Sequence, residues 1–205
     1  MTREFGEEGV AYENWGEPKI AAVEQELYAL VERYLNLEFY LRLKPRFGSL
    51  LLVTEDISQT PAPEGGAWSR PDLAAVAVWR HKFAPQTQLD LYSFEVKRAS
   101  AVDARAVHEA LAHRRFVNYS YLVWNRSATP DTGQFALITD MCSQLGVGLI
   151  VAHDPWDPRK YSVPVVAERF PLEPDAIDAF IEMRMSQPKR TRVLEGLASM
   201  AWRGA

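Results

Sequence analysis

Three ionisable residues lie where two predicted strands begin and end, and they are the strongest candidates for chemistry in this chain. Asp72 follows Arg70 and Pro71 and directly precedes the apolar run 73–79. Glu95 and Lys97 stand at the end of the next apolar run. Side chains alternate between the two faces of a strand, so Glu95 and Lys97 point to the same side. Carboxylates of this kind could bind a divalent cation beside an ammonium group.

The two runs are predicted to be antiparallel neighbours, because the connection at 81–87 is too short for a crossover helix. Asp72 and Glu95 would then lie within reach of one cation. With the backbone carbonyl of Val96 and water, they would form the oxygen-rich shell that Mg²⁺ or Mn²⁺ prefers. Lys97, beside that shell, could orient a water molecule or help to deprotonate it.

Charged residues at strand ends also occur on ordinary solvated surfaces, so this alternative has to be weighed against a site. Glu95 follows a largely apolar strand, where burial is expected, and a buried carboxylate requires a cation, a metal or a hydrogen-bond partner. Pro71 fixes the backbone approach to Asp72, which a merely solvated aspartate would not require. Both features favour a functional site.

The elements that must position these residues follow from hydrophobic periodicity. Strands are predicted over 73–79, 89–96, 119–124 and 147–152, and extended segments over 39–43 and 50–53. Helices are predicted over 18–34, 102–117 and 134–145. This order predicts an α/β fold, with a mixed central β-sheet flanked by helices.

Three parts of the chain are distinguished by composition and pattern. Residues 1–17 form an acidic N-terminal segment, 18–152 the α/β core, and 153–205 a helical C-terminal extension packed on or beside that core. The extension is predicted to contain helices over 175–183 and 191–200. Residues 57–70, with two prolines and two glycines, are predicted to form a loop before Asp72.

Composition excludes several classes of protein. The 205 residues carry a formal charge of −4, so no global basic field drives nucleic-acid binding. Phosphate-loop, dinucleotide-binding and serine-hydrolase motifs are absent, as is a zinc-spaced Cys and His set. No apolar run approaches a membrane span, and no secretory leader begins the sequence. With a single cysteine, Cys142, the chain is expected to be cytoplasmic.

The order of these features resembles the PD-(D/E)XK nuclease superfamily, which has the restriction-endonuclease-like fold. The resemblance lies in an acidic helix, Pro71-Asp72 opening a strand, Glu95-Val96-Lys97 about twenty residues on, and a following helix and strand, within 18–152. It implies that Asp72 and Glu95 are metal ligands, with the Val96 carbonyl, and that Lys97 positions the attacking water.

The resemblance also implies accessory residues on the flanking helices. A carboxylate on the first helix would be Glu24 or Glu26, and helical phase places Glu24 beside the buried stripe, where it could equally form a surface pair. His108 occupies the region of the later helix where the family often has a polar residue, although a surface histidine is the simpler interpretation. Arg70 is a further candidate.

The resemblance predicts a Mg²⁺- or Mn²⁺-dependent endonuclease acting on DNA, with RNA and a homodimer also open. The alternative is a catalytically silent protein of this fold that serves as a binding or scaffold module. The acidic N-terminal part favours a protein partner for such a module, with the C-terminal helices as its interface. A third alternative is an unrelated α/β protein in which the motif arose by chance.

Overall fold

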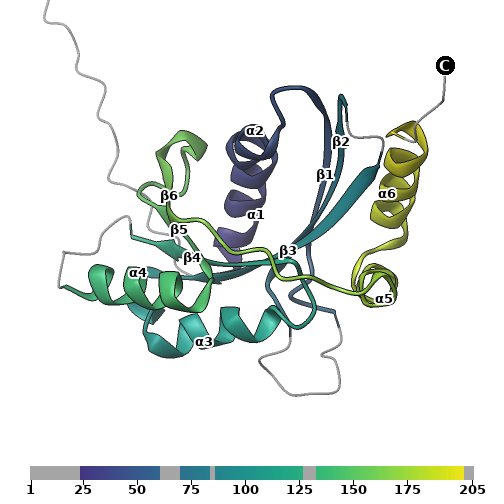
Figure 1. Cartoon of the computed structure of the whole chain (residues 1–205). Coiled ribbons are helices and arrows are strands. Elements are labelled where there is room, and N and C mark those ends of the chain that lie inside the picture. Colours follow the sequence, from purple (N-terminus) through teal and green to yellow (C-terminus); the bar gives the residue numbers. More distant parts are fainter. Residues whose placement is uncertain (1–23, 61–69, 84–85, 127–132, 201–205) are drawn as a thin grey trace, which may run out of the picture.

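A six-stranded mixed β-sheet forms the centre of the protein in a computed structural model, which describes residues 24–60, 70–83, 86–126 and 133–200. Its strands follow one another across the sheet in chain order (Figure 1). They are β1 Gly48–Asp56, β2 Leu73–His81, β3 Thr87–Lys97, β4 Tyr119–Asn125, β5 Gly148–Ala152 and β6 Tyr161–Val165. The predicted α/β fold with a mixed sheet flanked by helices is confirmed.

The sheet is antiparallel on one side and parallel at its centre. β1, β2 and β3 form antiparallel pairs, whereas β3, β4 and β5 run parallel. Helices α3 (Ala104–His113) and α4 (Gln134–Leu145) make the two crossovers that parallel pairing requires. The predicted antiparallel pairing of the strands that carry Asp72 and Glu95 is confirmed.

Helices cover both faces of the sheet (Figure 1). On one face α1 (Glu24–Tyr34), the π-helical η1 (Leu35–Phe39) and α2 (Tyr40–Leu43) pack on aromatic residues of β3 and β4. On the other, α3 and α4 pack on β4 and β5, while α5 (Pro174–Arg184) and α6 (Gln187–Met200) pack on β1 and β2. The inner strands are therefore buried on both faces, which explains the nearly continuous apolar sequences of β2 and β5.

The prediction of an extended segment at 39–43 is wrong, because the chain there continues α1 as helix through η1 and α2. Leu35 and Phe39 lie one helical turn apart and are fully buried, so they prolong the apolar stripe of α1. Phe39 packs edge-on against Tyr92, Phe94 and Tyr121. A short apolar run reads equally well as strand or helix, and here packing decides for helix.

The C-terminal part contains the two predicted helices and one strand that was not predicted. β6 pairs antiparallel with β5 at the edge of the sheet, where Pro164 is tolerated. α6 begins at Gln187, so Pro188 lies in its first turn rather than in a linker.

The segment 1–17 and most of the predicted loop 57–70 lie outside the described residues. No helix in the described part is long and apolar enough to cross a membrane.

Candidate functional site

The register of the β2–β3 hairpin brings the two predicted carboxylates together. Leu73 pairs with Phe94 in antiparallel register, so Asp72, one residue earlier, lies opposite Glu95, one residue later. Residues directly opposite on antiparallel strands project to the same face of the sheet. Asp72, Glu95 and Lys97 therefore border a common pocket at this end of the hairpin.

Asp72 is held by two hydrogen bonds. The Tyr28 hydroxyl donates to Oδ1 at 2.7 Å, and the backbone N–H of Val96 donates to Oδ2 at 2.8 Å. Burial nevertheless raises the pKa of Asp72, although both hydrogen bonds act to lower it. The contact from Val96 fixes the carboxylate against β3, and the role of the Val96 carbonyl as a ligand stays a prediction.

Glu95 is a buried carboxylate whose charge is only partly compensated. Burial and the neighbouring charge of Asp72 raise its pKa to about 8, against the opposing effect of Lys97. Two carboxylates that share a buried site disfavour each other's ionised forms, and a nearby cation reverses this. The pair thus favours an additional positive charge.

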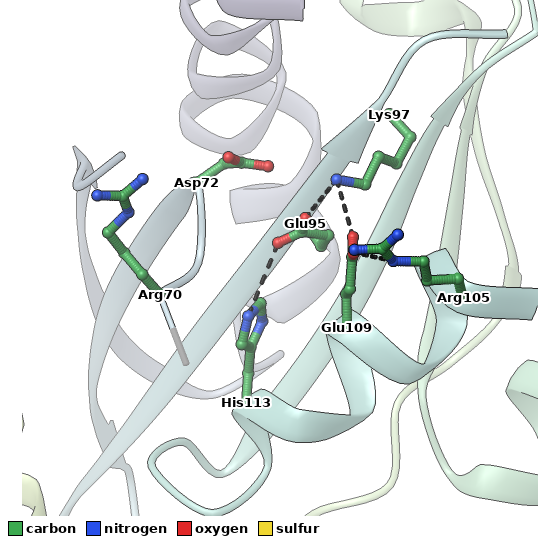
Figure 2. A pocket seen from close by; sticks show the side chains of 7 residues that line it. All are labelled: Arg70, Asp72, Glu95, Lys97, Arg105, Glu109 and His113. Atoms are coloured by element: carbon green, nitrogen blue, oxygen red, sulfur yellow. Dashed lines mark hydrogen bonds and ion pairs between the residues drawn. The ribbon is translucent and has the colours of Figure 1, made fainter. Parts of the chain in front are cut away.

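Lys97 lies among three acidic side chains, and Figure 2 shows its contacts with two of them, Glu95 and Glu109. Its Nζ is 2.5 Å from Glu95 Oε1, 3.1 Å from Glu109 Oε2 and 3.9 Å from Glu24 Oε1. Burial acts to lower the pKa of the ammonium, but the surrounding carboxylates raise it above its usual value. Lys97 therefore stays charged here, and it is suited to orienting water or an anion rather than to accepting a proton.

Helix α1 brings Glu24 and Tyr28 to the site because they lie one turn apart on the same helical face. Burial raises the pKa of Glu24, which faces Lys97. Glu26, the other candidate on this helix, is exposed to solvent. Helical phase thus distinguished the two glutamates as the sequence analysis expected.

Helix α3 contributes Glu109 and His113 to the site, two residues that the sequence analysis missed. His108, the residue expected from this helix, is exposed and does not line the pocket. Arg105, Glu109 and His113 recur every fourth residue and so occupy one face, and this spacing was the available signal. Arg105 Nε donates to Glu109 Oε1 at 3.1 Å, which orients that carboxylate toward Lys97.

His113 is buried within the site without a hydrogen-bond partner among the described residues. Its Nε2 lies 3.7 Å from Glu95 Oε2, beyond hydrogen-bond distance. Burial, with the charges of Lys97 and Arg115, lowers the pKa of His113 to about 3. His113 is therefore neutral at physiological pH.

These side chains surround a pocket of about 210 Å³ that is open to solvent (Figure 2). Arg70 lies at its margin, where its guanidinium also donates to the Thr60 carbonyl at 3.2 Å. The pocket is lined by Arg70, Asp72, Glu95, Lys97, Arg105, Glu109 and His113. A compact anionic group such as a phosphate could meet three cationic side chains here, beside the two opposed carboxylates.

The donor set is compatible with Mg²⁺ in its chemistry. In the described part of the chain no group of three or more His, Cys, Asp and Glu side chains could hold a metal ion in the arrangement present. Mg²⁺ keeps several water ligands, however, and proteins commonly bind it through only one or two carboxylates. Asp72 and Glu95 provide two, and burial is the main cause of their raised pKa values.

Comparisons with known proteins give no functional assignment. No family model matches the chain, and no curated protein matches it. Among solved structures, a protein of unknown function from Silicibacter pomeroyi is similar, with 15% sequence identity and a TM-score of 0.45. The similarity covers 88% of this chain and 94% of that one. The function has to be inferred from the site itself.

Proposed function

We propose that this protein is a metal-dependent nuclease that hydrolyses phosphodiester bonds in DNA. The observation that carries the proposal is the placement of Asp72 opposite Glu95, with Lys97 two residues further along the same strand. The order of an acidic helix, three strands, a helix and a strand around them agrees with the resemblance to the PD-(D/E)XK superfamily.

In this proposal Asp72 and Glu95 would hold Mg²⁺ or Mn²⁺, and Glu24, whose Oε1 lies 3.9 Å from Lys97 Nζ, would take part through water. When bound, the ion would polarise the scissile phosphate and lower the pKa of a bound water. Lys97 would orient the attacking water and stabilise the negative charge that develops on the phosphate oxygens. Water adds to phosphorus and the bond from phosphorus to the leaving oxygen breaks, so the products are a phosphate monoester and an alcohol.

Glu109 and His113 have supporting roles in this proposal. Glu109 positions the Lys97 ammonium through their 3.1 Å contact and is itself oriented by Arg105. His113 is neutral, so it adds no positive charge that would compete with a cation for Glu95. These two residues would tune the site rather than touch the reacting phosphate.

One observation favours the alternative of a catalytically silent binding or scaffold module. The Lys97 ammonium already contacts Glu95 and Glu109, so part of the acidic charge is neutralised without a metal. A scaffold has no need of a divalent cation at this position. Metal binding and cleavage therefore separate the two functions.

The test is cleavage of plasmid DNA and of labelled single-stranded, duplex and RNA oligonucleotides with Mg²⁺ or Mn²⁺. We expect cleavage by the wild type, and a loss of about 100-fold or more in Lys97→Ala and Asp72→Asn. Calorimetry should show that Asp72→Asn weakens Mn²⁺ binding while Lys97→Ala largely retains it, because an ammonium is not a ligand.

Glu24→Gln and Glu26→Gln form a matched pair on one helix, and only the first should reduce cleavage. Circular dichroism confirms that each variant is folded. A wild type that neither cleaves any of these substrates nor binds Mn²⁺ would rule out the nuclease and leave the scaffold module. Undiminished cleavage by Lys97→Ala would also contradict the assignment.

A further inference from the structure

A second cluster of charge lies at the C-terminal end of β2, which pairs with the beginning of β1. It surrounds a pocket of about 460 Å³ whose lining includes Arg46, Arg80 and Lys82 and no acidic residue. We refer to Arg46, Phe47, Arg80, His81, Lys82 and Phe83 as the basic-aromatic surface. Its positive charge contrasts with the formal charge of −4 on the whole chain.

The three cations of this surface are not neutralised by the rest of the described structure. Arg46, Arg80 and Lys82 form no ion pair with any described residue. Arg46 and Lys82 are exposed, and Arg80 is half-buried. Clustered cations without partners repel one another, and an anionic ligand would relieve that repulsion.

Two exposed phenylalanine rings accompany these cations. Phe47 is 58% exposed and Phe83 is 86% exposed, so both rings are accessible to a ligand. The Arg46 guanidinium carbon lies 5.3 Å from the centroid of the Phe47 ring, and Lys82 Nζ lies 5.1 Å from that of Phe83. Each ring thus stands next to a cation in an accessible position.

The backbone holds the two halves of the surface together. Gly48 pairs with His81 across the strands, and the Lys82 N–H donates to the Phe47 carbonyl at 3.3 Å. Gly48 has φ of 143°, and a Cβ atom added there would lie 2.1 Å from the Arg80 carbonyl oxygen. Only glycine allows this close approach, so the cations and rings are presented on a fixed frame.

We propose that the basic-aromatic surface binds single-stranded nucleic acid, with phosphates on the cations and bases stacked on Phe47 and Phe83. A nucleic-acid strand offers negative charge and flat aromatic faces in alternation, and single-strand binding proteins combine cationic grooves with aromatic side chains in this way. An acidic peptide would satisfy the cations but would leave both rings exposed. The combination of charge and rings therefore favours the nucleic acid.

This surface is separate from the pocket that Asp72 and Glu95 border, which we call the carboxylate pocket. Ten residues of extended chain separate Asp72 from Lys82, which corresponds to about 30 Å at about 3.3 Å per residue. Binding at the surface needs no metal and no intact carboxylate pair. The proposal is thus independent of the nuclease proposal, and either can fail without the other.

The test is fluorescence anisotropy of a labelled oligodeoxythymidine with the full-length protein in EDTA, which removes divalent cations and so excludes any contribution from cleavage. We expect salt-sensitive binding. The Phe47→Ala/Phe83→Ala double variant should weaken binding about tenfold or more. The Arg46→Ala/Lys82→Ala double variant should reduce the salt slope by about 1.4, because each phosphate contact on a single strand contributes about 0.7.

Matched controls lie elsewhere on the molecule. Arg115→Ala/Arg192→Ala also removes two exposed positive charges, and Phe170→Ala removes an exposed ring that lies under Arg114. Both should bind as the wild type does. The proposal is overturned if the oligonucleotide does not bind at low salt, or if the surface variants and the controls lose affinity equally. Equally tight binding of a labelled polyglutamate peptide would also overturn it, since charge alone would then explain the interaction.

Discussion

The charged residues at the two ends of β2 differ in how deeply they are buried and in whether they form ion pairs. At the end marked by Asp72, Glu95 is buried, and Lys97 contacts Glu95 and Glu109 within 3.1 Å. At the other end Arg46 and Lys82 are exposed and unpaired among the described residues. Here the backbone of Gly48 and the Lys82 N–H, rather than ion pairs, fix the geometry.

This difference indicates which groups the fold itself needs. Removing one partner of a buried ionic cluster leaves an uncompensated charge in a poorly solvated position, so the fold depends on the cluster. Exposed cations are solvated whether or not a ligand is present, and their removal costs the fold little. The first end suits a preorganised chemical site, and the second suits a surface that binds and releases a ligand.

The largest difference in the free energy of unfolding is expected between substitutions of one lysine at each end of β2. Lys97→Met should reduce the free energy of unfolding by about 3 kcal/mol, because Glu95 and Glu109 lose their cation in a largely buried position. Lys82→Met should change it by less than about 0.5 kcal/mol. Denaturant unfolding at neutral pH measures both, and equal losses would show that the proposed difference between the two ends is wrong.

A somewhat smaller loss of stability is expected from a substitution that alters the backbone under the basic-aromatic surface. Gly48→Ala should cost about 2 kcal/mol, since it combines an unfavourable φ with a collision against the Arg80 carbonyl. Gly133→Ala is the control, because Gly133 also has a positive φ of 77° but no atom within 4 Å of an added Cβ. It should cost only about 1 kcal/mol. Thermal and denaturant unfolding would detect the difference, and equal costs would mean that the close approach at Gly48 is unimportant.

The smallest effect is the pH dependence of stability at the carboxylate end, measured in EDTA. The folded-state pKa of Glu95 is raised to about 8, so the folded protein holds this proton more tightly than the unfolded chain and loses stability as pH rises toward 8. Below about pH 6.5 the lowered pKa of His113 acts in the opposite direction, because the unfolded chain then takes up a proton that the folded protein excludes.

The effects of Glu95 and His113 on stability oppose each other between about pH 4.5 and 6.5. The decline in the free energy of unfolding should therefore appear mainly between about pH 6.5 and 8. One group contributes at most about 1.4 kcal/mol per pH unit. Glu95→Gln should flatten this part of the profile, and urea unfolding across the range measures it. A variant with the wild-type slope would show that Glu95 is not the titrating group.

Much of the fold followed from local sequence. Largely apolar runs of strand length predicted the central strands, and the short connection between two of them predicted an antiparallel pair. The same reasoning placed Asp72 opposite Glu95, because strand alternation and pairing are periodic and local. Helical phase likewise favoured Glu24 over Glu26.

Where the local sequence fits more than one structure, only the packing against the rest of the protein decided which one forms. Residues 39–43 became helical because Phe39 fits between aromatic rings of β3 and β4. β6 forms because the edge of β5 offers unpaired backbone groups, although Pro164 weakens its own strand pattern. On α3, the way the helix sits against the sheet turned Glu109 and His113 toward the pocket and His108 toward solvent.

The sequence by itself determined the identity and spacing of Asp72, Glu95 and Lys97, because two neighbouring strands with a short connection carry them, whereas the packing of α3 added Glu109 and His113. Only the tertiary structure decided the basic-aromatic surface. Its two halves, Arg46-Phe47 and Arg80 to Phe83, are far apart in the chain and meet through the pairing of Gly48 with His81. Pairing between distant strands depends on the register and packing of the whole sheet, which no short stretch of sequence specifies.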